Sequence, residues 1–195
     1  MVGRRIPSNQ VWRLADRYAA LAAGRARPAT GFVSQPEPRS VGSYARGKQL
    51  TAGNILLAGY LAEAPETSIW DLSADDAFVA EAQGFAWLDD LAAYGAAPAI
   101  RLAQDWTWDW IARHGNGTGP GWTPDLTGRR IIRWIHHAIL LLASRDLGET
   151  EAFYRAITRQ ATYLSRRWKA AAPGLARFEA LTGLIYAGTS LIGLD

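Results

Sequence analysis

Apolar residues recur at helical spacing over almost the whole chain after residue 70, and this periodicity limits the fold more than any other feature of the sequence. Glycine, proline and capping residues punctuate the pattern at intervals of about one helix. Helices predicted in this way cover residues 73–95, 98–113 and 125–144, and begin again at about Thr150 and at Pro173. We therefore expect an all-α fold built from antiparallel helix hairpins.

Three tryptophans mark a weak repeat in these helices. Trp87, Trp110 and Trp134 are each followed by leucine or isoleucine and lie 23 and 24 residues apart, about one helix plus one turn. This spacing predicts stacked helices that carry one tryptophan each at a similar level. The last helix is apolar and runs almost to Asp195, so we expect a further C-terminal portion of the same protein.

The N-terminal part follows another pattern. A first helix is predicted from Ser8 to just before Pro28. Its apolar face comprises Val11, Leu14, Ala15, Tyr18, Leu21 and Ala22. Residues 28–70 have no helical period and four prolines, with at most a short strand around Ile55, and so long a segment must wrap over other elements or shape a site. The single structural domain thus divides into residues 1–27, 28–70 and 71–195.

Composition excludes several classes of protein. The 195 residues contain no cysteine, which rules out disulfides, cysteine nucleophiles and thiolate metal sites. Apolar residues make up 49% of the chain and charged residues 20%, which is typical of a folded domain and not of a disordered one. Lys48 and Lys169 are the only lysines, so Schiff-base and P-loop chemistry have little basis.

The net charge of +3 conceals an asymmetry along the chain. Residues 1–50 carry nine basic and two acidic side chains, whereas residues 51–100 carry eight acidic side chains and no basic one. The arginine-rich arm, which includes Arg4, Arg5 and Arg13, could contact nucleic acid. We favour intramolecular pairing with the acidic segment, since the arginines are spaced out and form no tract.

No targeting or membrane-spanning segment is expected. Met1 is followed by a polar stretch without an apolar core or cleavage site, and the longest apolar run, residues 138–143, is far short of the ~20 residues that span a bilayer. These features predict a cytoplasmic protein without a membrane partner.

The most informative stretch is a glycine-rich loop that leads directly into the helix predicted at 125–144. No Gly-Lys-Ser/Thr follows the glycines, so the loop is not a P-loop. At 100° per residue, one stripe of this helix carries Arg129, Arg133 and His136, and a second stripe beside it carries Arg130, Trp134 and His137. The apolar arc that would face the core comprises Ile131, Ile132, Ile135, Ala138, Ile139 and Leu142. Arginines in a first turn oppose the helix dipole, and a bound anion or nearby carboxylates would offset that cost.

Two interpretations of these stripes stay open. They form either a solvated basic face without chemistry, or a site in which arginines grip a carboxylate beside an imidazole that takes a proton. A metal site is not expected, because the adjacent His136 and His137 point about 100° apart on one helix. No cofactor is expected either.

Aromatic and acidic residues offer weaker candidates. Trp108 cannot share a helix face with Trp106 and Trp110, so it packs elsewhere or lines a cleft where its ring could stack on a sugar. Asp89 and Asp90 diverge on a helix, which argues against a glycosidase pair.

Five irregular strings suggest a family. They are residues 30–39 (TGFVSQPEPR), 53–59 (GNILLAG), 84–91 (GFAWLDDL), 119–129 (GPGWTPDLTGR) and 178–188 (FEALTGLIYAG). Together they resemble the N-terminal part of bacterial heparinase II/III-family proteins in their alphaproteobacterial branch, over nearly the whole chain from about Pro28.

The resemblance implies an incomplete α/α toroid that is normally followed by more helices and a β-sandwich domain. Characterised members are polysaccharide lyases that neutralise a uronate carboxylate, remove the C5 proton and eliminate the 4-linked sugar. The family's Asn-His pair falls on His136 and His137: His137 matches the histidine, and His136 stands where asparagine is usual. The family tyrosine belongs to a later glycine-rich motif, so Tyr186 is not assigned this role. The resemblance also leaves a periplasmic location open.

The resemblance and the helix faces together suggest a site and a function. His136 and His137 are the candidate catalytic residues. The candidate substrate-binding residues are Arg129, Arg130, Arg133, Trp134 and Trp108. The expected function is the toroid part of a lyase for uronate-containing acidic polysaccharides, inactive by itself; the alternatives are a non-catalytic helical interaction module and a nucleic-acid-binding arm.

Overall fold

The computed structural model of the chain describes residues 8–34, 38, 41–65, 67–72 and 74–194, with side chains in the first helix described from residue 14. The described part is mostly helical, as predicted, with two small two-stranded sheets. In chain order its elements are α1 (Ser8–Ala23), β1 (Gly31–Phe32), α2 (Tyr44–Thr51), β2 (Asn54–Leu57), β3 (Tyr60–Glu63), the 3₁₀ turn η1 (Ile69–Asp71), α3 (Asp76–Gln83), α4 (Ala86–Tyr94), α5 (Ala97–His114), α6 (Pro124–His136), α7 (Ala138–Leu142), α8 (Leu147–Arg167), the 3₁₀ turn η2 (Trp168–Ala170), α9 (Leu175–Ser190) and β4 (Leu191–Ile192).

The helix predicted at 73–95 is in fact two helices. Asp75 caps α3 by accepting a hydrogen bond from the backbone of Phe78, while Ser73, where the predicted helix begins, lies outside the described residues. The chain turns at Phe85, which has a left-handed φ of 63°, and α4 then runs to Gly95 as predicted. Five apolar residues spaced along α3, α4 and the turn between them are buried: Phe78, Ala82, Phe85, Leu88 and Leu91.

The ring of Phe85 packs at the centre of the aromatic core. These contacts stabilise the left-handed backbone conformation of Phe85. Its ring lies 4.7 Å from Trp87, 5.9 Å from Trp110 and 5.7 Å from Trp134, measured between ring centroids. These three tryptophans are fully buried and come from α4, α5 and α6. Their convergence on one ring agrees with the predicted placement of one tryptophan per helix at a similar level.

The helix predicted at 125–144 is also interrupted. The break falls at His137 (φ −109°, ψ 19°), which ends α6 and precedes the short helix α7. Because the turn changes the direction of the side chains that follow, Ile139 is 74% exposed, and its predicted place in the core is wrong. Thr123 is the N-cap residue of α6, so the helix begins at Pro124, one residue before the predicted start.

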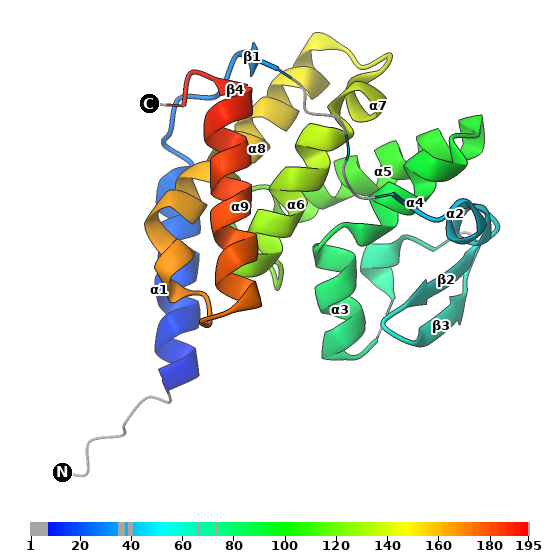
Figure 1. Cartoon of the computed structure of the whole chain (residues 1–195), viewed down its shortest axis with the longest axis horizontal. Helices are drawn as coiled ribbons and strands as arrows, with labels where there is room; N and C mark the ends of the chain where they lie inside the picture. The colour runs from blue at the N-terminus through cyan, green and yellow to red at the C-terminus, as the bar shows by residue number, and fades with distance from the viewer. Residues whose placement is uncertain (1–7, 35–37, 39–40, 66, 73, 195) are drawn as a thin grey trace.

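Helices α6 and α9 lie side by side along much of their length (Figure 1). Gly128 of α6 faces Gly183 of α9 so closely that a Cβ atom on Gly183 would lie 2.4 Å from the Gly128 Cα. Two glycines at the crossing let the backbones approach and bring the side chains on either side of the crossing together.

Residues 28–70 are more regular than predicted. The strand expected around Ile55 is present as β2, paired antiparallel with β3, but α2 is a helix that the sequence did not reveal. Ser43 caps α2, which packs against α4. β1 pairs antiparallel with β4 at the end of α9, so the start of this segment lies beside the C-terminal end of the last helix (Figure 1).

Two predicted apolar faces point to solvent. In α1, Leu14, Tyr18 and Leu21 are exposed, and the helix packs on α8 through small residues, Ala19, Ala20 and Ala23. In α9, the exposed residues are Leu175, Phe178 and Ile185. In both helices small side chains make the close contacts with the neighbouring helix, and the large apolar side chains are exposed to solvent. None of the helices in the described ranges is long and apolar enough to cross a bilayer.

Candidate functional site

A cavity of about 300 Å³ lies between α6 and α9. It is lined by Arg129, Ile132, Arg133, His136, Glu179, Thr182 and Tyr186. The first stripe predicted on α6, namely Arg129, Arg133 and His136, therefore shares one face as expected. Residues of α9 spaced by three and four positions complete the wall, because such residues share a helix face.

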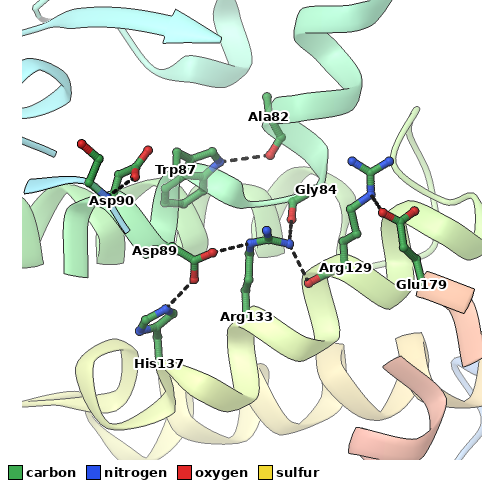
Figure 2. A network of polar contacts seen from close by, with 10 residues as sticks. Ala82, Gly84, Trp87, Asp89, Asp90, Arg129, Arg133, His137 and Glu179 are labelled. Carbon is green, nitrogen blue, oxygen red and sulfur yellow. Dashed lines mark hydrogen bonds and ion pairs between the residues drawn. The ribbon is translucent and has the colours of Figure 1, made fainter. Parts of the chain in front are cut away.

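Arg129 and Glu179 join the two helices at this cavity. The Arg129 Nε lies 3.3 Å from the Glu179 Oε1 (Figure 2). A weaker pair of 3.8 Å links Arg129 to Asp125 in the first turn of α6. These carboxylates offset the cost of an arginine near a helix N-terminus. Burial raises the pKa of Glu179, and the charge of Arg129 only partly opposes this effect. The carboxyl group of Glu179 therefore takes up a proton at a higher pH than a solvated glutamate does.

Arg133 is held by partners from α4 and from the turn before it. Its Nε donates to Asp89 Oδ2 at 3.0 Å, and its Nη1 donates to the Gly84 carbonyl oxygen at 3.2 Å (Figure 2). The other oxygen of Asp89 lies 2.8 Å from His137 Nε2. Asp89 therefore links Arg133, which lines the cavity, to His137, which does not.

His136 is the imidazole that lines the cavity, although only 5% of its surface is exposed. Its ring packs edge-on against that of Tyr186, with 5.1 Å between the centroids. From the sequence, Tyr186 was not assigned the role of the family tyrosine. The structure instead places its ring beside an imidazole and two arginines.

The second predicted stripe lies in the core. Arg130 is fully buried, with its guanidinium 4.1 Å from the centre of the Trp110 ring. It donates to Gln160 Oε1, to the carbonyl oxygens of Gln83 and Gly121, and to Thr127 Oγ1. Burial lowers its pKa to about 9. Arg130 joins α3, the glycine-rich loop and α8, and it has no surface to offer a ligand; its predicted role in substrate binding does not fit this position.

Trp134 and Trp108 are also placed away from the cavity. Trp134 is fully buried and stacks on Phe153, with 5.1 Å between ring centroids. Trp108 is half-buried, packs on Phe153 and lies under the Arg145 guanidinium at 5.6 Å. The positions of Trp134 and Trp108 fit a role in packing better than a role in stacking on a sugar.

Other cavities bring together different groups. One of about 410 Å³ lies between the loop after α1 and the start of α8, and one of about 340 Å³ lies beside the β2–β3 turn. Neither is lined by histidine. Within the described ranges no three histidine, aspartate or glutamate residues are arranged to hold a metal ion.

Three residues of the site were not found from the sequence: Asp89, Glu179 and Tyr186. They are 40 or more positions from the α6 residues that they contact. The only signal was indirect, namely the expectation that carboxylates or an anion would offset the arginines of α6.

Comparison of the chain with protein-family models finds no match, and comparisons with curated proteins and with solved structures find none either.

Proposed function

We propose that the cavity between α6 and α9 binds the carboxylate of a uronate residue, and that the chain is the α/α-toroid part of a heparinase II/III-like polysaccharide lyase. The observation that carries this proposal is the meeting of Arg129, Arg133, His136 and Tyr186 in one cavity. The five strings that resemble the family supply the reaction class.

Each group suits one requirement of the substrate. Guanidinium groups bind carboxylates through charged, often bidentate hydrogen bonds. The cavity volume of about 300 Å³ is at the lower end of the ~300–1,000 Å³ usual for small-molecule sites, which suits one sugar unit of a longer chain. Arg133 is already oriented by Asp89 and Gly84, so little conformational freedom is lost on binding.

The elimination can be assigned to these residues. Arg129 and Arg133 neutralise the carboxylate, which makes the C5 proton more acidic. His136 takes that proton, the C5–H electron pair forms a C4=C5 double bond, and the C4–O bond breaks. The departing oxygen takes a proton from the Tyr186 hydroxyl. The role proposed for the histidine of the family pair thus moves from His137 to His136, because His137 faces Asp89.

Binding tests the proposal most directly. Titration calorimetry of the chain with polygalacturonate, alginate and hyaluronan should show binding, with uncharged dextran as the negative control. Arg133→Ala should weaken binding by at least about tenfold, since a charge-assisted hydrogen bond contributes roughly 1.5–3 kcal/mol. The matched control is Arg155→Ala, which removes an exposed arginine that is paired with Glu151 on α8.

Two results would contradict the proposal. One is the absence of binding to any polyuronate at low salt. The other is equal loss of affinity in the Arg133→Ala and Arg155→Ala proteins, which would indicate attraction by net charge without a defined site. Where binding holds, ultraviolet absorbance of the unsaturated uronate tests elimination, and His136→Ala should remove any increase.

A second candidate function is a helical interaction module, favoured by the exposed apolar residues of α9. Leu175 is 75% exposed and Phe178 is 69% exposed on the same helix. Clustered exposed apolar residues mark interaction sites. Concentration-dependent self-association in sedimentation velocity that is lost in Phe178→Ser, and unchanged in His137→Ala, would support this alternative.

A further inference from the structure

Asp89 is a buried carboxylate with charged or protonated partners on both oxygens. It is 7% exposed, its Oδ2 accepts from Arg133 Nε at 3.0 Å, and its Oδ1 lies 2.8 Å from His137 Nε2. A carboxylate buried in this way is stable only when both oxygens are satisfied. The geometry meets that condition with Arg133, which lines the cavity, and His137, which does not; Figure 2 shows both contacts.

The hydrogen bonds of Arg133 define which edge of its guanidinium faces a ligand. Nε is held by Asp89, and Nη1 is held by the carbonyl oxygens of Gly84 and Arg129. A guanidinium is planar, so fixing two of its nitrogens fixes the third. Nη2 is the nitrogen of Arg133 that these hydrogen bonds leave available.

We propose that Asp89 and His137 act together as the positioning pair of the cavity. The Nε2–H of His137 donates to Asp89 Oδ1, which leaves Oδ2 turned toward Arg133 and holds the guanidinium in its binding orientation. His137 thereby affects ligand binding through Asp89 and Arg133 without touching the ligand. The effect on affinity rests on the proposed function, whereas the proton position on His137 does not.

The state of His137 follows from its partner. An ionised carboxylate can only accept hydrogen bonds, so the nitrogen facing it must carry the proton. The partner of one imidazole nitrogen selects the tautomer of the ring. His137 therefore carries its proton on Nε2 in the folded protein, whether or not Nδ1 is also protonated.

The first test needs no substitution. Long-range ¹H–¹⁵N correlation spectra of the chain at pH 8 report which nitrogen of each imidazole is protonated. His137 should show protonated Nε2, with a proton that exchanges slowly because the ring is buried. A neutral His137 with its proton on Nδ1 would overturn the proposal, whatever the ligand of the cavity.

The second test uses two amides that imitate one imidazole nitrogen each. The side-chain amide nitrogen of glutamine reaches about the position of Nε2, and that of asparagine about the position of Nδ1. His137→Gln should retain polygalacturonate affinity to within about threefold, whereas His137→Asn should lose on the order of tenfold, the loss expected when a buried charged hydrogen bond is left unmade. Equal affinities for these two proteins would refute a positioning role.

Asp89→Asn and Asp90→Asn form the matched pair of carboxylate variants. In Asp89→Asn the side-chain amide would have a single accepting oxygen for two donors, so affinity should fall by about tenfold. Asp90, whose carboxylate accepts from the Ser43 backbone, should tolerate the same change.

Thermal unfolding of these variants is measured in parallel. If Asp89→Asn does not fold, the comparison of His137→Gln with His137→Asn still tests whether His137 positions Arg133. If the wild-type protein binds no polyuronate but His137 is protonated on Nε2, the proposed function fails and the proton assignment survives.

Discussion

Arg129 and Glu179 form an ion pair across the cavity, with 3.3 Å between Nε and Oε1, so one of the two arginines that line the cavity already has a carboxylate partner within the protein. A uronate must compete with Glu179 for this guanidinium. Burial raises the pKa of Glu179 above its ordinary value of 4.5, so the carboxyl group becomes neutral at a higher pH than a solvated glutamate does. Protonation of Glu179 would release Arg129 and remove a negative charge from the cavity.

We expect polyuronate binding to strengthen as the pH falls toward the raised pKa of Glu179 and to weaken as the pH rises through it. Glu179→Gln should bind more tightly at pH 7.5 and should lose part of the pH dependence. Calorimetric titrations with polygalacturonate at pH 5.5 and 7.5 provide the comparison. An unchanged pH profile in Glu179→Gln would contradict this competition.

The stability of the protein should depend on the close contact between Gly128 of α6 and Gly183 of α9. A methyl group at Gly183 would lie 2.4 Å from the Gly128 Cα, so Gly183→Ala must push the helices apart. We expect a loss of about 2–3 kcal/mol in the free energy of unfolding. The control is Gly188→Ala in the same helix, where nothing lies within 4 Å and alanine should stabilise by about 0.5–1 kcal/mol. Urea unfolding of both variants measures the difference; similar values for the two would contradict the close contact.

Arg130 should matter for stability and not for ligand binding. Its removal leaves Gln160 Oε1 and two buried carbonyl oxygens without their donor. We expect Arg130→Met to cost about 3 kcal/mol of unfolding free energy, because unsatisfied buried acceptors carry a penalty of roughly 1–3 kcal/mol each. Polygalacturonate affinity of the folded fraction should stay within about threefold of wild type. A large loss of affinity with unchanged stability would place Arg130 in the site after all.

The contrast between Arg130 and its neighbours shows how far the sequence could predict the site. Helical spacing correctly placed Arg129, Arg133 and His136 on one face, since that follows from 100° per residue. Helical spacing alone could not predict which face of α6 would be covered by other parts of the protein. Arg130 is buried because α3, α8 and the glycine-rich loop supply acceptors for it, and those acceptors lie 9 to 47 positions away in the chain.

The break after α6 shows a second limit. Residues 138–142 continue the apolar pattern of a helix, so nothing local signals a turn at His137. Helical periodicity also failed for α1 and α9, where large apolar residues point outward and alanine or glycine makes the contact. Patterning ranks residues by hydrophobicity, whereas close helix packing selects small ones. The all-α class needed only periodicity and was predicted; the cavity required tertiary contacts and was not.

His114 should make stability depend on pH. Burial and, to a lesser extent, the charges of Arg130 and Arg113 lower its pKa below the ordinary 6.5, and its ring packs edge-on against Trp70 and Trp110. In the window between the lowered folded pKa and 6.5, the unfolded chain binds a proton that the folded chain does not. The stability that depends on a neutral His114 is therefore fully present above pH 6.5. It is lost as the pH falls from 6.5 through the lowered pKa of the folded state.

His114→Gln removes this titration, so its free energy of unfolding should fall less than that of the wild-type protein between pH 7.5 and pH 5.5. One proton limits the difference to about 1.4 kcal/mol per pH unit. Urea unfolding monitored by tryptophan fluorescence at both values measures it. The comparison is made as a difference between the two proteins, so that pH effects common to both cancel. Parallel stability profiles for wild type and variant would show that His114 is not the group responsible.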